Sequence, residues 1–240
     1  MKLTILGCYG PYPSPLGGCS GYLLESGDTK LLLDLGSGSL RNYLKYDTLD
    51  HLDALILSHL HADHCSDVFV LRYALELNSL VLPLWSPGQP KEEAARLPYK
   101  NAFHIHTIHQ EYSVRIGAFT VSFLKMKHSV ESYAIKLEAE GKTFVYSGDT
   151  GITNYFVEFI RNCDLLLCEA AIADSNEQKK DAHLSAAQVC ALSKSAKCKK
   201  VVLTHFSPEY TKEQYLSEIR NCTIAAADII LAEENRSIII

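Results

Sequence analysis

The first third of the chain alternates short apolar runs with turn residues, a pattern typical of β-strands. We expect a strand over residues 2–6 and a hairpin over 21–36 that turns at Gly27–Asp28. A further buried strand is expected over 53–59, where the apolar run DALIL gives way to polar residues. Beyond it, apolar residues recur at helical spacing, at Val68, Leu71 and Leu75.

The segment 79–112 shows no clear pattern, because four prolines break it into short pieces. We expect it to be an excursion over the surface. Two hairpins are expected after it, one over 114–124 that turns near Gly117 and one over 133–148 that turns near Glu140–Gly141.

From about residue 153 onward, helices and strands alternate. Two helix starts carry the spacing of a capping box, Ser185 with Gln188 and Thr211 with Gln214. The expected elements are a helix over 153–162, a strand over 165–170, a helix after Ser185, a strand over 200–205, a helix over 211–221 and strands over 226–234 and 237–240.

Strands first and helix–strand pairs afterwards indicate an α/β fold. Two mixed sheets packed face to face, with helices outside, would use these elements without a linker. The 240 residues fit one domain that spans residues 1–240.

The composition narrows the class of protein. The chain is 47% hydrophobic and carries a net charge of −5, which favours a large core and argues against a generally basic surface for nucleic acid. No apolar stretch approaches the roughly 20 residues that a membrane-spanning helix needs. Eight cysteines are scattered without a C-x-x-C pair, as in a reduced protein. We therefore expect a cytoplasmic protein with no membrane partner.

The strongest chemical signal is the segment SHLHADH, directly after the buried strand over 53–59. It places His59, His61, Asp63 and His64 within six residues. Imidazole and carboxylate are the groups that hold zinc, manganese or iron. Two residues that alternate at a strand end point the same way, so His59 and His61 can chelate one ion. A turn after them can direct Asp63 and His64 to a second ion.

Three more candidate ligands stand at the ends of expected strands. His128 follows FLKMK, Asp149 follows FVYSG and His205 follows KVVLT. Each is a weak signal by itself, since a lone histidine after a strand is more often a surface residue. Together with the SHLHADH segment they supply about three ligands for each of two divalent ions, with one carboxylate left to bridge them.

This order of motifs resembles the metallo-β-lactamase superfamily, and within it the branch of ribonuclease Z and phosphodiesterases. The resemblance rests on H-x-H-x-D-H, a separate histidine, the aspartate of SGDTG and the histidine of LTHFSP, and it spans nearly the whole chain. It implies a four-layer αββα sandwich with two metal ions, usually zinc, at one edge. By position, His59, His61 and His128 would bind one ion, Asp63, His64 and His205 the other, and Asp149 would bridge.

In that family a metal-bound hydroxide is the nucleophile, and the carboxylate that matches Asp63 is often assigned as its base. An aspartate at 149 differs from the cysteine that β-lactamases usually have, and it agrees with phosphodiesterases and with thioesterases of the glyoxalase II type. His183 precedes Ser185, the expected N-cap, which favours an anionic oxygen nearby. The ribonuclease Z branch has a histidine at this point in the order, assigned as a general acid or transition-state stabiliser.

Two departures from ribonuclease Z weaken a role in tRNA processing. His128 and Asp149 are only 21 positions apart in the sequence, which leaves no room for the long arm that grips tRNA. The basic Arg-Asn of the first loop is replaced by Gly-Gly-Cys-Ser at Gly17–Ser20. We therefore expect a binuclear metallohydrolase that cleaves a small phosphodiester or cyclic nucleotide, with RNA possible but not favoured. The alternatives are a tRNA 3′-endonuclease, an ester or thioester hydrolase of the glyoxalase II or lactonase kind, and a metal-binding sensor without turnover.

Several weaker signals complete the picture. Ser20, Ser129 and Tyr133 are candidate substrate contacts, and Asp34 is expected to support the site rather than bind an ion. The histidines at 104, 106 and 109 imitate a ligand cluster, but we expect a surface strand there. Related enzymes are commonly dimers, so a homodimer is expected.

Overall fold

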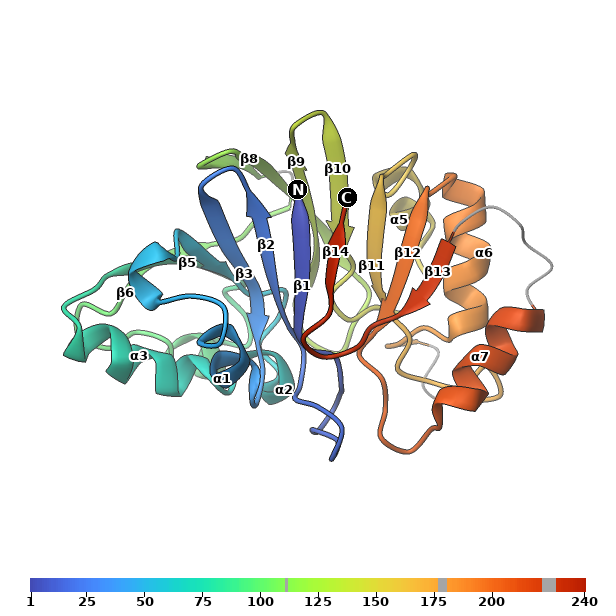
Figure 1. Ribbon diagram of the computed structural model, residues 1–240, viewed down its shortest axis with the longest axis horizontal. Coiled ribbons are helices and arrows are strands. Elements are labelled where there is room, and N and C mark those ends of the chain that lie inside the picture. Colours follow the sequence, from blue (N-terminus) through green and yellow to red (C-terminus); the bar gives the residue numbers. More distant parts are fainter. Residues whose placement is uncertain (111, 177–180, 222–227) are drawn as a thin grey trace.

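Two seven-stranded sheets form the centre of the protein in the computed structural model, which describes residues 1–110, 112–176, 181–221 and 228–240 (Figure 1). In the first sheet the strand order is β14-β1-β2-β3-β4-β5-β6. Its strands are β1 (Lys2–Gly7), β2 (Gly21–Ser26), β3 (Thr29–Leu35), β4 (Ala54–Ile56), β5 (Leu82–Ser86), β6 (Phe103–Thr107) and β14 (Ser237–Ile239). The strands from β14 to β3 pair antiparallel and those from β3 to β6 pair parallel, so the sheet is mixed.

The second sheet has the order β13-β12-β11-β10-β9-β8-β7. Its strands are β7 (Ser113–Ile116), β8 (Phe119–Met126), β9 (Ser132–Ala139), β10 (Lys142–Tyr146), β11 (Leu165–Glu169), β12 (Lys200–Thr204) and β13 (Asp228–Leu231). The two hairpins expected from the sequence form β7 to β10, and the helix–strand pairs form the parallel part from β10 to β13.

Helices cover the outer faces of both sheets (Figure 1). The first sheet carries α1 (Ser39–Tyr43), a 3₁₀ turn (Leu49–His51), α2 (Ala62–Cys65), α3 (Val68–Leu77) and α4 (Lys91–Ala94). The second sheet carries α5 (Asn154–Phe159), α6 (Ala186–Ala196) and α7 (Lys212–Asn221). This four-layer αββα arrangement confirms the expected fold.

The unbroken apolar runs of the first sheet arise because its strands are buried on both faces. Leu31 and Leu33 of β3 point into the core between the two sheets, and Leu32 points into a second core beneath the helices. Val68, Leu71 and Leu75 of α3 close this second core. A strand with helices on one face and a sheet on the other has no solvent face, so it shows no apolar–polar alternation.

The expectation of a surface excursion over 79–112 is wrong. β5 and β6 lie in this segment and extend the first sheet, and Leu82 and Leu84 are buried. Of the four prolines only Pro83 lies inside a strand, and the other three stand in the connections. Counting prolines overstated the break, because Pro83 stands near the start of β5, before the pairing with β4 begins at Leu84.

Both expected helix caps are present. The hydroxyl of Ser185 accepts from the amide of Gln188 at 3.2 Å, and the Gln188 side chain accepts from the Ser185 amide at 2.9 Å. Thr211 and Gln214 make the same pair of bonds. The strand expected over 226–234 begins outside the described residues, and its described part is β13. No helix in the described ranges is long and apolar enough to cross a membrane.

Candidate metal centre

The candidate ligands converge at one edge of the molecule because each follows the end of a strand. His59 and His61 follow β4, and Asp63 and His64 lie on α2 directly behind them. From the second sheet, His128 follows β8, Asp149 follows β10 and His205 follows β12. Both sheets present these strand ends at the same edge. All seven residues expected to bind metal are brought together there.

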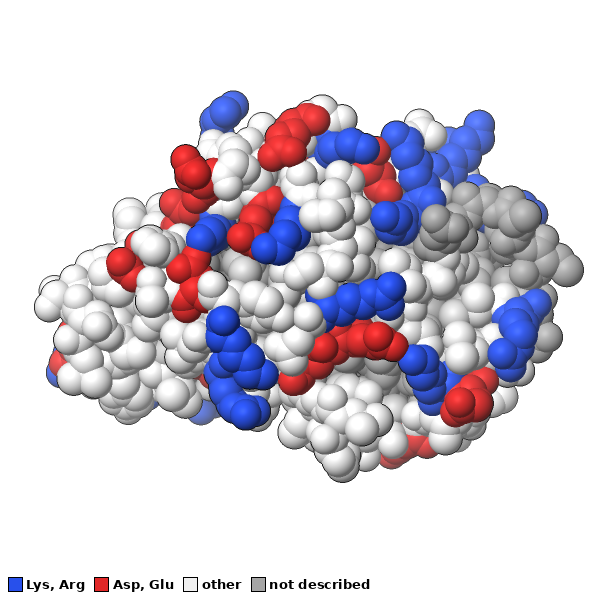
Figure 2. All heavy atoms as spheres, viewed as in Figure 1, with Lys and Arg blue, Asp and Glu red and all other residues white. Residues whose placement is uncertain are grey.

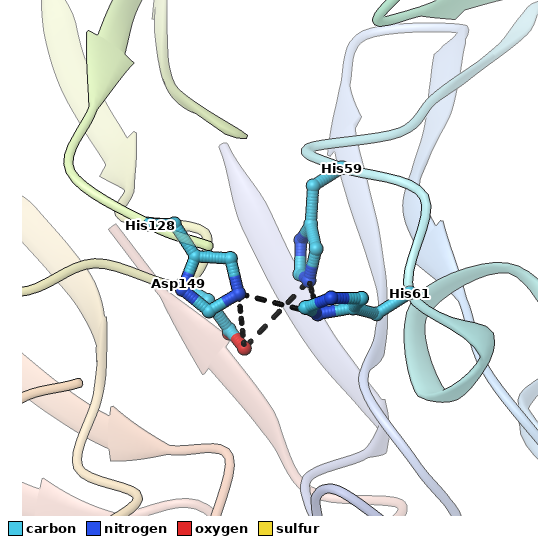
Figure 3. Close-up of side chains that lie close together, drawn as sticks. All are labelled: His59, His61, His128 and Asp149. Atoms are coloured by element: carbon cyan, nitrogen blue, oxygen red, sulfur yellow. Dashed lines mark hydrogen bonds and ion pairs between the residues drawn. The ribbon is translucent and has the colours of Figure 1, made fainter. Parts of the chain in front are cut away.

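One group of ligand atoms consists of three ring nitrogens and a carboxylate oxygen (Figure 3). His61 Nδ1 lies 3.1 Å from His59 Nε2 and 3.2 Å from His128 Nε2. Asp149 Oδ2 lies 3.7 Å from His59 Nε2 and 4.0 Å from His128 Nε2. Figure 3 shows the three rings and the carboxylate directed at one point between them.

The second group lies next to the first and shares Asp149. His64 Nε2 is 3.6 Å from Asp63 Oδ2, and His205 Nε2 is 3.8 Å from the same oxygen. Asp149 Oδ1 lies 3.3 Å from His64 Nε2, and Asp149 Oδ2 lies 3.3 Å from His205 Nε2. The carboxylate of Asp149 therefore faces both groups, as a bridging ligand would.

Burial and mutual contact set the charges in the centre. Burial lowers the pKa of His59 well below its ordinary value and also lowers those of His61 and His205, so these rings are neutral and offer a lone pair. Burial would raise the pKa of Asp149, but His205 and then His64 outweigh it and hold that pKa well below its ordinary value. Neutral imidazoles around an ionised carboxylate are the protonation states that metal binding needs.

The residues fit a divalent cation. His64 Nε2 and Asp149 Oδ1 are buried and have no hydrogen-bond partner, although such groups are nearly always satisfied. Burial opposes protonation of His64, yet Asp149 and Asp63 raise its pKa well above its ordinary value, so the site demands positive charge. A cation among these atoms would meet both requirements without a proton on His64.

Asp34 supports the centre from behind, as expected, and is not among the clustered ligands. Its carboxylate accepts hydrogen bonds from the Ser58 amide, the Ser58 hydroxyl and the Tyr146 hydroxyl, each at 2.7 Å. Its Oδ2 also lies 2.7 Å from His64 Nδ1. This contact places the proton on Nδ1 and turns Nε2 toward the candidate ion, the usual arrangement for a metal-binding histidine.

The three expected substrate contacts lie in different surroundings. Ser129 is exposed beside His128. Tyr133 is buried, and its hydroxyl donates to Glu131 at 3.0 Å. Ser20 has no exposed surface, and its hydroxyl is 3.0 Å from His205 Nδ1. Ser20 thus holds a candidate ligand in place. The sequence marked Ser20 as a candidate substrate contact but not this bond, because its partner lies 185 residues away in the chain.

His183 lies beside the ligands and is held by Glu169. His183 Nδ1 is 3.1 Å and 3.3 Å from the two Glu169 oxygens and 3.8 Å from Asp149 Oδ2. Burial opposes protonation of His183, but Glu169 and then Asp149 outweigh it and raise its pKa to about 9. Glu169 is also fixed by the amides of Thr150 at 2.7 Å and Ala171 at 3.2 Å.

Glu169 was not predicted from the sequence. It ends the apolar strand LLLCE, so the rule that identified the strand-end ligands would also have found it. The remaining histidine cluster stays outside the centre: His104 and His106 lie on β6, where His106 stacks on Trp85 at a centroid distance of 4.5 Å. The cysteines at 8, 19, 65, 163, 168 and 198 are buried free thiols, and Cys222 lies outside the described ranges.

Comparison with known proteins agrees with this architecture. A family profile described as "Beta-lactamase superfamily domain" matches residues 30–206. The probable metallo-hydrolase YhfI of Bacillus subtilis is 32% identical over 211 residues, which cover 85% of this chain and 86% of YhfI. Its crystal structure has a TM-score of 0.93 at 29% identity and covers 99% of this chain and 98% of its own.

Two more distant structures share the fold. The short form of human tRNase Z has a TM-score of 0.80 at 22% identity, covering 100% of this chain and 99% of its own. A diphosphatase from the PhnP family has a TM-score of 0.75 at 16% identity, covering 100% and 97%. An αββα sandwich with clustered histidines and aspartates at one edge defines a metallo-hydrolase. The chain belongs to the metallo-β-lactamase superfamily.

Proposed function

We propose that the protein is a phosphodiesterase that uses two divalent metal ions and acts on a small phosphodiester, such as a cyclic nucleotide. The observation that carries the proposal is the pair of His183 and Glu169 beside the candidate ligands. A histidine whose pKa is about 9 is protonated at neutral pH and can donate a proton. An alkoxide that leaves phosphorus needs such a donor, whereas a thiolate that leaves carbon hardly does.

The seven ligands would hold the ions in two adjacent positions. The first ion would be bound by His59, His61 and His128, and the second by Asp63, His64 and His205. Asp149 would bind both ions. Zinc is the first choice, and manganese or iron suit the same donors. Ions bound there supply an activated water at neutral pH and polarise the phosphoryl oxygen.

The side chains around the ions divide the remaining work. Asp63 is 9% exposed at the open side of the second group, so it can orient the attacking water and accept its proton. His183 keeps its Nδ1 on Glu169, which leaves Nε2 free to donate to the leaving oxygen. Glu169 stabilises the positive charge on His183 before this transfer.

Two observations favour a small substrate over tRNA. The residues between His128 and Asp149 are consumed by β9, β10 and their tight turn, so no arm extends there. On the face shown in Figure 2, acidic side chains lie among the basic ones, and the net charge is −5. Human tRNase Z and the PhnP-family diphosphatase share the fold, and both names denote chemistry at phosphorus.

The experiment that tests the proposal combines element analysis with hydrolysis of bis(p-nitrophenyl) phosphate and 3′,5′-cyclic AMP. We expect about two ions per chain and turnover of at least one of these diesters. His183→Ala should lower kcat about 10²- to 10⁴-fold with the metal content unchanged. His106→Ala, which replaces a histidine outside the centre, should change neither.

Other outcomes point to other functions. If the fully metallated protein cleaved only p-nitrophenyl acetate or a thioester, and His183→Ala left that rate unchanged, an ester or thioester hydrolase would replace the proposal. Cleavage of precursor tRNA at moderate salt would indicate a tRNA 3′-endonuclease. We also propose that the protein is located in the cytoplasm. We propose further that it forms a homodimer, which sedimentation of the purified chain would test.

A further inference from the structure

A cavity lies beside the candidate metal centre, and none of the candidate ligands lines it. Its volume is about 570 Å³, which is within the usual range for small-molecule sites. Three segments form its walls: the loop after β1, the segment from the end of β12 into the start of α7, and the end of β13 with the residues that follow it. We propose that this cavity binds a flat aromatic ligand without negative charge, and that this ligand is not the phosphodiester substrate.

Aromatic rings provide the walls. Phe206 and Tyr215 pack with ring centroids 4.7 Å apart, and Tyr9 stands edge-on to Phe206 at 6.3 Å. Tyr210 stands nearly perpendicular to Tyr215, at 87° and 6.2 Å. Phe206 and Tyr215 are buried against each other, whereas Tyr9 and Tyr210 are half-buried and keep ring surface that a planar ligand can contact.

The charges at the cavity select against anions. Its lining includes three carboxylates, those of Glu213, Glu233 and Glu234, against one ammonium, that of Lys212. Lys212 Nζ is 2.7 Å from Glu233, and Arg236 Nη1 lies 3.8 Å from the same carboxylate. The negative charges of Glu213 and Glu234 repel a phosphate or carboxylate and attract a cation, which the tyrosine faces also favour.

The cavity and the metal centre share one wall. Phe206 lines the cavity and directly follows His205. The Gly10 amide donates to the Phe206 carbonyl at 3.1 Å, and Gly10 packs so closely on the His205 ring that a methyl group would overlap it. A ligand in the cavity therefore lies against the backbone that carries a candidate metal ligand.

The test uses three probes with one ring system and different charges: tryptamine, indole and indole-3-acetate. Calorimetric titration of the metal-loaded protein should give a Kd for tryptamine of about 1 mM or below, the range expected for such small ligands. Indole should bind more weakly, and indole-3-acetate at least about tenfold more weakly than tryptamine. The difference in Kd between tryptamine and indole-3-acetate should be smaller at 0.5 M salt. Equal binding of all three, or no binding of any, would overturn the proposal.

Variants locate the binding. Tyr210→Ala should weaken the binding of tryptamine at least about fivefold. Tyr73→Ala, which replaces an exposed tyrosine on α3, should leave this binding unchanged. Glu213→Lys should reverse the preference toward indole-3-acetate, while Glu92→Lys on α4 should leave it unchanged. Both glutamates are exposed, so neither change threatens the fold. If His183→Ala removed tryptamine binding and Glu213→Lys did not affect it, the probe would be occupying the metal centre and the proposal would fail.

Discussion

At the scale of single residues, the histidines of the centre differ in what surrounds them. His59 and His205 are deeply buried among other rings, and burial keeps their pKa values low. His183 is paired with the carboxylate of Glu169, which raises its pKa to about 9. The same residue type is therefore neutral at one position and positively charged a few ångströms away.

Replacing Glu169 by glutamine should move the basic limb of the activity profile. Without the negative charge of Glu169, the pKa of His183 falls from about 9 toward its ordinary value. The proton donor is then lost at lower pH, so kcat of the variant should begin to decline at a lower pH than kcat of the unchanged protein. Measuring kcat from pH 6 to 10 for both proteins tests this. Identical profiles would contradict the assigned role.

The same pair predicts how stability depends on pH in the metal-free protein. The pKa of His183 is raised in the folded state to about 9, from an ordinary value of 6.5. Its contribution, at most about 3 kcal/mol, is complete below pH 6.5 and is lost as pH rises through 9. Urea unfolding of EDTA-treated protein should show this decline, and in Glu169→Gln it should be smaller.

Asp34 should control metal affinity without touching the metal. Asp34→Asn removes the charge that orients His64, so affinity at the second position should fall about 10- to 100-fold. Competition with a chromogenic chelator measures this. Asp28→Asn, in the exposed turn between β2 and β3, is the matched control. An unchanged affinity in Asp34→Asn would show that the backbone alone fixes His64.

At the scale of elements, the connections after the strands place the chemistry. The loop between β1 and β2 contributes no ligand, yet Gly10 packs on His205 and Ser20 bonds to its ring. A loop without ligands thus sets the position of one. The sequence shows only a stretch rich in glycine and proline there, which leaves its contacts undetermined.

Gly10→Ala should therefore act on the metal centre. The added methyl group would overlap the His205 ring, so this ligand must move and the second position loses a donor. We expect the metal content to fall from about two ions per chain to about one. Gly88→Ala, where the methyl group would meet only Thr107 Cγ2 at 3.2 Å, should retain both. Element analysis of the two variants decides.

At the scale of the whole molecule, the sequence predicted most strands of both sheets, the helices α3, α5, α6 and α7, and the seven residues that converge. It could do so because each ligand stands at the end of an apolar run, and parallel strand ends share an edge. It failed over 79–112, where prolines hid β5 and β6. It also did not reveal the bond between Ser20 and His205, because hydrogen bonds between residues far apart in the chain leave no periodic signal.

Removing the metal should loosen the contact between the sheets, since each ion position draws ligands from both. An ion whose free concentration is a thousand times its Kd adds about 4 kcal/mol to the free energy of unfolding, if the folded chain binds it and the unfolded chain does not. We expect EDTA to lower the Tm by roughly 5–15 °C. The double variant His104→Ala/His106→Ala, on β6, should show the same shift. A Tm that does not respond to EDTA would contradict a bound ion.

The division of the candidate ligands between the two sheets also bears on when a complete metal site can form as the chain is synthesised. His59 to His64 leave the ribosome early, and His205 emerges last of the seven. A nascent chain thus exposes an incomplete, unselective chelator for most of translation. Selectivity among competing ions therefore requires the completed fold. A chain truncated before residue 205 is expected to bind metal ions with little selectivity.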